Sequence, residues 1–154
     1  MKILRVTTRL EITEHELGDS VIGRHMRRKT LCDLIGKECS GYERVYPRRL
    51  YKDFNHKSNA DGCDAWPGVS LVMLVDESGA LRGQDLNLVG SWLYGSDGSG
   101  NAIMGNILFV SEDAGDYCGI EPGTLRRLKE QLGDLVMSLK AASEEWLKTE
   151  LKGK

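Results

Sequence analysis

The longest apolar runs in the chain lie at 69–75 and 103–110. The first is rich in β-branched and aliphatic residues with almost no polar break, which is typical of a strand covered on both faces. The second is predicted to be another buried strand. Between them, the run Asp76-Glu77-Ser78-Gly79 contains the residue types of a turn, and 80–83 is predicted to return as a short strand. The pattern therefore predicts the centre of a β-sheet.

Two segments show helical periodicity instead. Apolar residues fall at helical spacing within 86–94, and Asp85 or Asn87 is available as the N-cap. From 122 to 150 the apolar positions alternate in steps of three and four, and Pro122 suits the first turn of a helix. These positions are Leu125, Leu128, Leu132, Leu135, Leu139, Ala142 and Trp146. The chain should therefore end in a long amphipathic helix.

An unbroken helix of that length would extend about 42 Å at 1.5 Å per residue, which is longer than a domain of this size needs for its own cover. In one interpretation Gly133 permits a bend, the leucine face lies across the sheet, and only the end past Ala142 projects. In the other, the leucine seam pairs with its copy in a homodimer. That seam is made of Leu125, Leu128, Leu132, Leu135 and Leu139.

The remaining pattern completes a single α+β domain over residues 1–154. Strands are predicted at 2–8 and 42–47, the latter ended by Pro47, and 10–18 is predicted to be a second strand or an extended return. A further helix is predicted at 27–38. We expect a mixed or antiparallel sheet of about five strands, at 2–8, 42–47, 69–75, 80–83 and 103–110, with the helices on one face.

One group of residues resembles a known family. It consists of Asp76, Glu77 and Gly79 after a strand, Asn87 opening a helix, and Ile103, Gly105 and Asn106 in a later strand. In this order the chain, over roughly 30–132, resembles a domain-of-unknown-function family (number 3846) found in small proteins of phages and mobile elements. The resemblance implies a phage or prokaryotic cytoplasmic setting and no established chemistry.

Composition agrees with a globular domain. The 154 residues are 40% apolar and 29% charged, and no apolar run approaches the roughly 20 residues that span a bilayer. The first residues contain frequent charges and no small-residue cleavage site, so we expect a cytoplasmic protein without a membrane partner. The cysteines are Cys32, Cys39, Cys63 and Cys118. Their spacing matches no metal motif, and we expect buried free thiols.

Charge is divided unevenly along the chain. Residues 1–60 hold 13 Lys and Arg against 8 Asp and Glu, whereas residues 61–154 hold 8 against 15, and the net charge is −2. The basic surplus lies in 24–29 and 44–52, the second interleaved with Tyr42, Tyr46 and Tyr51. An acidic chain argues against a duplex-DNA binder, because that affinity rests on neutralising many phosphates.

A small phosphate-bearing ligand needs far fewer cations than a duplex. Guanidinium groups bind phosphate oxygens in pairs, and aromatic faces stack on bases. We therefore predict a nucleotide-like ligand site with phosphate on Arg48 and Arg49, a base on Tyr51 or Trp92, and polar contacts from Asn87 or Asn101. The same residues are also consistent with a solvated basic face. The glycine-rich run 95–101 could cradle an anion, although a plain connector explains it better.

Catalytic signals are weak. The densest group of ligand-type residues is His56, Asp61, Cys63 and Asp64. Its spacing does not match a zinc site, and a cysteine nucleophile needs a base placed by the fold. The adjacent pair Asp76 and Glu77 is explained by turn formation. No catalytic residue, metal ligand or cofactor is therefore predicted.

The sequence leaves several classes of function open. The first is a non-catalytic phage-type binding protein, a sponge that sequesters a nucleotide-derived immune signal. The second is an inhibitor that presents its acidic C-terminal half to a host factor, through Glu112, Asp113, Asp116, Glu144, Glu145 and Glu150. A nucleotide-degrading enzyme is the third.

Overall fold

The computed structural model describes residues 1–18, 24–50, 69–96, 101–113 and 116–152. These residues form one antiparallel sheet and three helices, which confirms the predicted α+β class. The strands are β1 (Lys2–Val6), β2 (Ile12–Glu16), β3 (Tyr42–Val45), β4 (Val69–Asp76), β5 (Ile107–Asp113) and β6 (Asp116–Cys118). The helices are α1 (Arg24–Ile35), α2 (Leu88–Tyr94) and α4 (Pro122–Lys152).

The sheet is built around β4 and β5, the two strands that the apolar runs predicted. Its order is β2-β1-β5-β4-β3, and β6 also pairs with β5. The β4–β5 ladder runs from Val69 opposite Asp113 to Val75 opposite Ile107. The other edge of β5 is shared, because β1 pairs with its first half and β6 with its second half. All these pairings are antiparallel.

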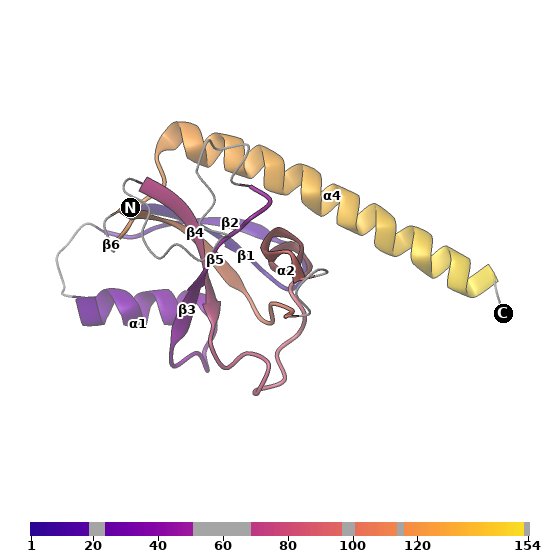
Figure 1. Cartoon of the computed structure of the whole chain (residues 1–154), viewed down its shortest axis with the longest axis horizontal. Coiled ribbons are helices and arrows are strands. Elements are labelled where there is room, and N and C mark those ends of the chain that lie inside the picture. Colours follow the sequence, from indigo (N-terminus) through magenta and orange to yellow (C-terminus); the bar gives the residue numbers. More distant parts are fainter. Residues whose placement is uncertain (19–23, 51–68, 97–100, 114–115, 153–154) are drawn as a thin grey trace.

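Helices cover both faces of the sheet, so the prediction that they lie on one face is wrong. Successive strand residues point to opposite faces, and both sets are apolar in β4 and β5. Leu71 and Met73 pack in a cluster with α2 and α4, whereas Val72 and Leu74 pack in a second cluster with α1. Figure 1 shows α1 and α4 on opposite sides of the sheet. Because both faces of the sheet are apolar, each face needs a helix to shield it from water.

Several boundaries also differ from the predicted ones. Residues 80–83 do not form a strand; the chain makes successive turns over 77–83 and reaches a positive φ of 68° at Gly83. Strand β5 begins at Ile107 instead of 103, because Gly105 also has a positive φ, of 88°, which a regular ladder does not accept. The segment 10–18 does contain a strand, β2, and the short β6 was not predicted.

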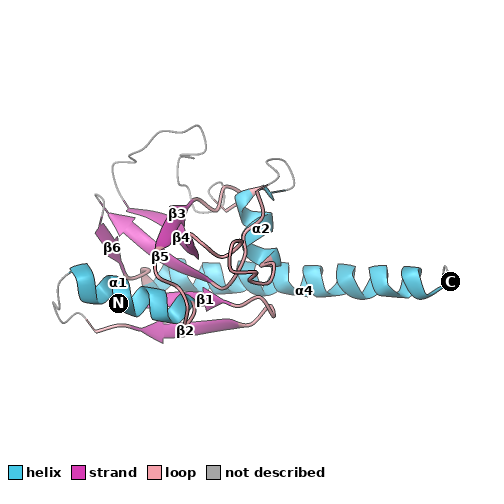
Figure 2. Cartoon of the chain, turned by 90° about the horizontal axis from the view of Figure 1, so that it is seen from below, coloured by secondary structure: helices cyan, strands magenta, loops and turns pink. Residues whose placement is uncertain are grey.

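Helix α4 packs its leucine face on its own sheet. Leu125, Leu128 and Leu132 are buried in the cluster that also contains β1, β4 and β5 residues, and Leu135 and Leu139 pack against that cluster. Leu125, Leu128 and Leu132 are therefore not available as a seam for a second chain, and nothing in the described residues supports the predicted homodimer. The helix is continuous through Gly133. Its C-terminal part projects beyond the sheet in both views (Figures 1 and 2), and residues 140–145 are exposed or half-exposed.

Candidate functional site

The turn that follows β3 determines where two of the predicted arginines lie. Strand β3 ends at Val45, as expected from Pro47, and the chain then turns through two hydrogen bonds. The Arg48 N–H donates to the Tyr46 carbonyl at 2.9 Å, and the Leu50 N–H donates to the Pro47 carbonyl at 2.8 Å. Leu50 is buried, and Arg48 and Arg49 are exposed. The turn therefore presents two adjacent guanidinium groups above an apolar anchor.

These arginines lie against aromatic residues of α2. The Arg49 guanidinium carbon lies 3.7 Å from the centroid of the Trp92 ring, and its Nη1 donates to the Trp92 carbonyl at 2.7 Å. The Arg49 N–H donates to the Leu93 carbonyl at 3.2 Å. The Arg48 guanidinium carbon lies 5.4 Å from the Tyr94 ring centroid. Arg48, Arg49 and Trp92, which lie in two distant segments, are thus brought together.

A cleft of about 370 Å³ opens beside this arrangement, between the turn, α2 and α4. We call it the Trp92 cleft. Its lining residues are Arg49, Leu50, Trp92, Leu93, Gln131, Leu132, Asp134 and Leu135. Its size falls within the range of small-molecule sites. Among its leucines, Leu135 is half-buried and can contact a ligand, whereas the other three are buried. The Trp92 side chain remains 45% exposed, so its ring is accessible to a ligand.

Three lining or neighbouring residues were not predicted. Tyr94 is separated from Trp92 by one residue, and this aromatic pair was the available signal. Gln131 and Asp134 lie three residues apart on α4, a spacing that places side chains on one helix face. In the sequence they resemble ordinary solvated positions between leucines. Only the packing of α4 beside α2 makes them part of a cleft.

Asn87, predicted as a ligand contact, is a buried structural residue. Its Oδ1 accepts from the Gly90 N–H at 2.9 Å and caps α2, which confirms its alternative role as N-cap. Its Nδ2 donates to the carbonyls of Val6 and Gly105 at 3.1 Å and 2.9 Å. The side chain is fully buried. It therefore has no surface to offer to a ligand.

The other predicted contacts do not join the cleft. Asn101 is exposed, its backbone carbonyl accepts a hydrogen bond from Ser96 Oγ at 2.5 Å, and it is not among the residues that line the cleft. Tyr51, the His56–Asp64 group and most of the glycine-rich run lie outside the described residues.

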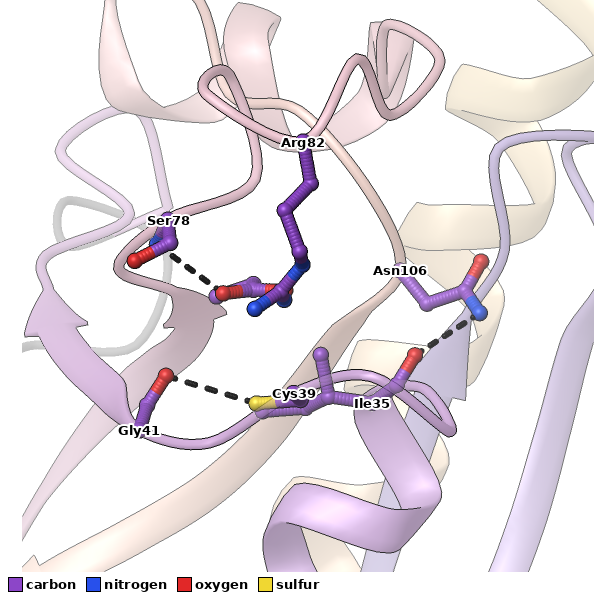
Figure 3. Close-up of polar contacts among 7 residues, drawn as sticks. Ile35, Cys39, Gly41, Ser78, Arg82 and Asn106 are labelled. Atoms are coloured by element: carbon purple, nitrogen blue, oxygen red, sulfur yellow. Dashed lines mark hydrogen bonds and ion pairs between the residues drawn. The ribbon is translucent and has the colours of Figure 1, made fainter.

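A second polar cluster lies where α1, β4 and the 77–83 turns meet (Figure 3). The Ser78 N–H donates to Asp76 Oδ1 at 2.9 Å, and Arg82 forms an ion pair with the same buried carboxylate. The turn interpretation of Asp76 is thereby confirmed. Nearby, Cys39 Sγ donates to the Gly41 carbonyl at 3.3 Å, and Asn106 Nδ2 donates to the Ile35 carbonyl at 2.9 Å. The contacts of Asp76 connect β4 to the 77–83 turns, and the Asn106 contact connects α1 to the segment before β5.

This cluster does not have the properties of a reactive site. Burial, followed by the neighbouring Cys32 thiol, raises the pKa of Cys39 to about 11. A cysteine nucleophile reacts as the thiolate, which such a pKa disfavours at neutral pH. Cys32 and Cys39 are free thiols, as predicted, but only Cys32 is buried, and Cys39 is half-buried. The cluster therefore contributes to structure.

The same holds for the residues that carry the family resemblance. A Cβ atom on Gly79 would lie 2.8 Å from the Met104 carbonyl oxygen, so this glycine allows the turn to approach the 103–106 loop. Gly105 has a positive φ, Asn87 caps α2, and Asn106 connects α1 to the start of β5. Each of these contacts maintains the fold and lies outside the Trp92 cleft.

Further arginine–aromatic contacts lie on the α1 face. The Arg28 guanidinium carbon is 5.5 Å from the Tyr42 ring centroid, and that of Arg44 is 5.4 Å from Tyr46. Arg44 also forms an ion pair with Glu112, which reduces its net positive field. The Trp92 cleft combines an arginine–aromatic contact with a volume of about 370 Å³, so it is a candidate for a ligand.

Within the described residues, no group of three or more His, Cys, Asp or Glu side chains is placed to hold a metal ion. None of the described helices has an apolar stretch long enough to cross a bilayer. Comparison with protein-family models, curated proteins and solved structures found no match to this chain.

Proposed function

We propose that the chain is a non-catalytic binding protein for a small nucleotide-like ligand, held in the Trp92 cleft. The observation that carries this proposal is the Arg49 guanidinium, stacked 3.7 Å from the Trp92 ring centroid at the edge of a cleft of about 370 Å³. Arginine and tryptophan in this arrangement offer the two contacts that nucleotides use, a charged donor for phosphate and a π-face for the base.

The phosphate contact and the base contact lie at different places in the site. Arg48 and Arg49 lie together on the exposed turn, so a phosphate there would approach two positive charges without crossing apolar surface. Trp92 and the half-buried Leu135 of α4 would cover the base. Base stacking on an aromatic side chain is worth about 1–3 kcal/mol. Asn87 has no part in this proposal, because its amide is buried within the fold.

The biological role that we propose is sequestration of a nucleotide-derived immune signal in the host cytoplasm, as an anti-defence sponge of a phage. The phage setting follows from the family resemblance of the 76–106 motifs. Sequestration needs tight binding and no reaction.

Thermal shift against cyclic dinucleotides and ADP-ribose derivatives tests the proposal. A ligand at 100 times its Kd stabilises the native state by about 2.7 kcal/mol, so at least one member should raise the Tm clearly. The double variant R48A/R49A should keep its fold and lose the shift. Arg126→Ala is the matched control, because Arg126 is an exposed arginine of α4 that does not line the cleft.

The same mixtures distinguish binding from turnover. Chromatography of the ligand after incubation should return it intact, because sequestration leaves its bonds unchanged. A Tm that no panel member shifts, or a shift that R48A/R49A retains, would contradict the proposed site. Conversion of the ligand to products would replace the sponge with an enzyme.

A further inference from the structure

Helix α4 contributes two polar residues to the Trp92 cleft. Together with Arg49 they make the two sides of the cleft chemically different. Arg49 lies on the turn, whereas Asp134 and Gln131 lie on α4 and line the same cleft. A phosphate is attracted to the arginine and repelled by the aspartate carboxylate. The phosphate end of a ligand should therefore lie at the turn, and its base should lie between Trp92 and α4.

From this arrangement we infer that the cleft selects guanine over the other bases, with Asp134 reading its Watson–Crick edge. The inference rests on the proposed function and adds the identity of the base. Gln131 makes the second contact with the base, because its amide can donate to the O6 carbonyl that adjoins the guanine N1–H.

The chemistry of the bases supports guanine. An ionised carboxylate only accepts hydrogen bonds, and guanine presents two adjacent donors, N1–H and the N2 amine, that match its two oxygens. Adenine and cytosine place an acceptor beside their amine, and uracil places carbonyls on both sides of its single N–H. Each of these bases would direct a lone pair at the carboxylate, which is a repulsive contact.

The Asp134 side chain is also suitably placed for this role. The residue is exposed, and within the described part of the chain no hydrogen bond or ion pair engages its carboxylate. One charged pair of α4 is that of Lys129 with Glu14 on β2 at 3.1 Å, and Lys129 does not line the cleft. A base can therefore reach Asp134 without displacing an existing partner.

Isothermal titration of the full chain with 5′-GMP, 5′-IMP and 5′-AMP tests the inference. We expect GMP to bind about ten-fold or more tightly than AMP, in line with the discrimination of a bidentate contact. IMP, which lacks the N2 amine, should fall between them. Asp134→Asn should reverse the order, because an asparagine amide pairs bidentately with adenine and offers guanine a donor against a donor. A merely structural role of Asp134 would not produce that reversal.

Glu130→Gln is the matched control, since Glu130 is an exposed carboxylate of α4 outside the cleft. It should leave all three affinities unchanged. If the nucleotides bind equally and R48A/R49A still removes binding, the guanine inference is overturned while the proposed function stands. If none of the three nucleotides binds the wild-type chain, the guanine inference is overturned, and the thermal-shift panel of cyclic dinucleotides and ADP-ribose derivatives decides the proposed function separately.

Discussion

Asn87 shows how much of this fold can depend on one polar side chain. Its amide caps α2 and donates to carbonyls at the end of β1 and in the 103–106 loop, so it joins three segments inside the core. A buried amide is stabilising only when its hydrogen bonds are made, and all three are made here. The Asn87 side chain therefore has a structural role.

Replacing Asn87 by alanine should destabilise the protein by about 2–4 kcal/mol, because the cap is lost and two buried carbonyls lose a donor. Urea unfolding followed by circular dichroism measures the change. Asn101→Ala is the control of the same residue type, and because Asn101 is exposed its effect should stay within about 0.5 kcal/mol. Equal unfolding midpoints for the two variants would contradict the structural role of Asn87.

At this scale, some site residues could be predicted from residue type and others could not. Arg48, Arg49 and Trp92 were predicted because arginine beside exposed aromatics has a recognisable chemistry, and the structure brings them together. Asn87 fitted both a cap and a ligand contact, and only its burial decides between them. Gln131 and Asp134 have no local signal, since their place in the cleft depends on how α4 packs.

Among the elements, β4 and β5 were predictable because their apolar runs are long and nearly uninterrupted. The same feature implied cover on both faces, and it therefore already argued against placing every helix on one side. The segment 80–83 was taken for a strand, but the ion pair of Arg82 with Asp76 folds it back as a turn. Its polar side-chain contact outweighs a weak local preference for strand.

Helix α4 has one face committed to the core and one exposed, and two alanine substitutions distinguish them. Leu132→Ala removes a fully buried side chain and should cost about 2–5 kcal/mol. Met137→Ala changes a residue that is 71% exposed and should stay within about 0.5 kcal/mol.

Denaturant unfolding of both variants at two protein concentrations provides the measurement. The cost of Leu132→Ala should not depend on concentration, because the leucine packs within one chain. A cost that grows on dilution would indicate that this face pairs with a second chain, since mass action links dimer stability to concentration.

At the scale of the whole molecule, the basic half and the acidic half of the sequence both contribute residues to the Trp92 cleft. The turn with Arg48 and Arg49 comes from the basic half of the sequence, and the α4 residue Asp134 comes from the acidic half. The fold brings them to the same cleft. A ligand with a negative end and a hydrogen-bond-donating end matches both, which is the chemistry of a guanine nucleotide.

The most direct test of the central claim is the map of backbone amide shifts, measured by NMR, on adding 5′-GMP and 5′-AMP separately to the labelled chain. The account predicts that the largest shifts for a bound nucleotide lie at Arg49, Trp92 and Gln131, three residues from three elements that meet only in the Trp92 cleft. Absence of shifts with both nucleotides, or shifts centred on Arg28 and Tyr42 across the sheet, would contradict it.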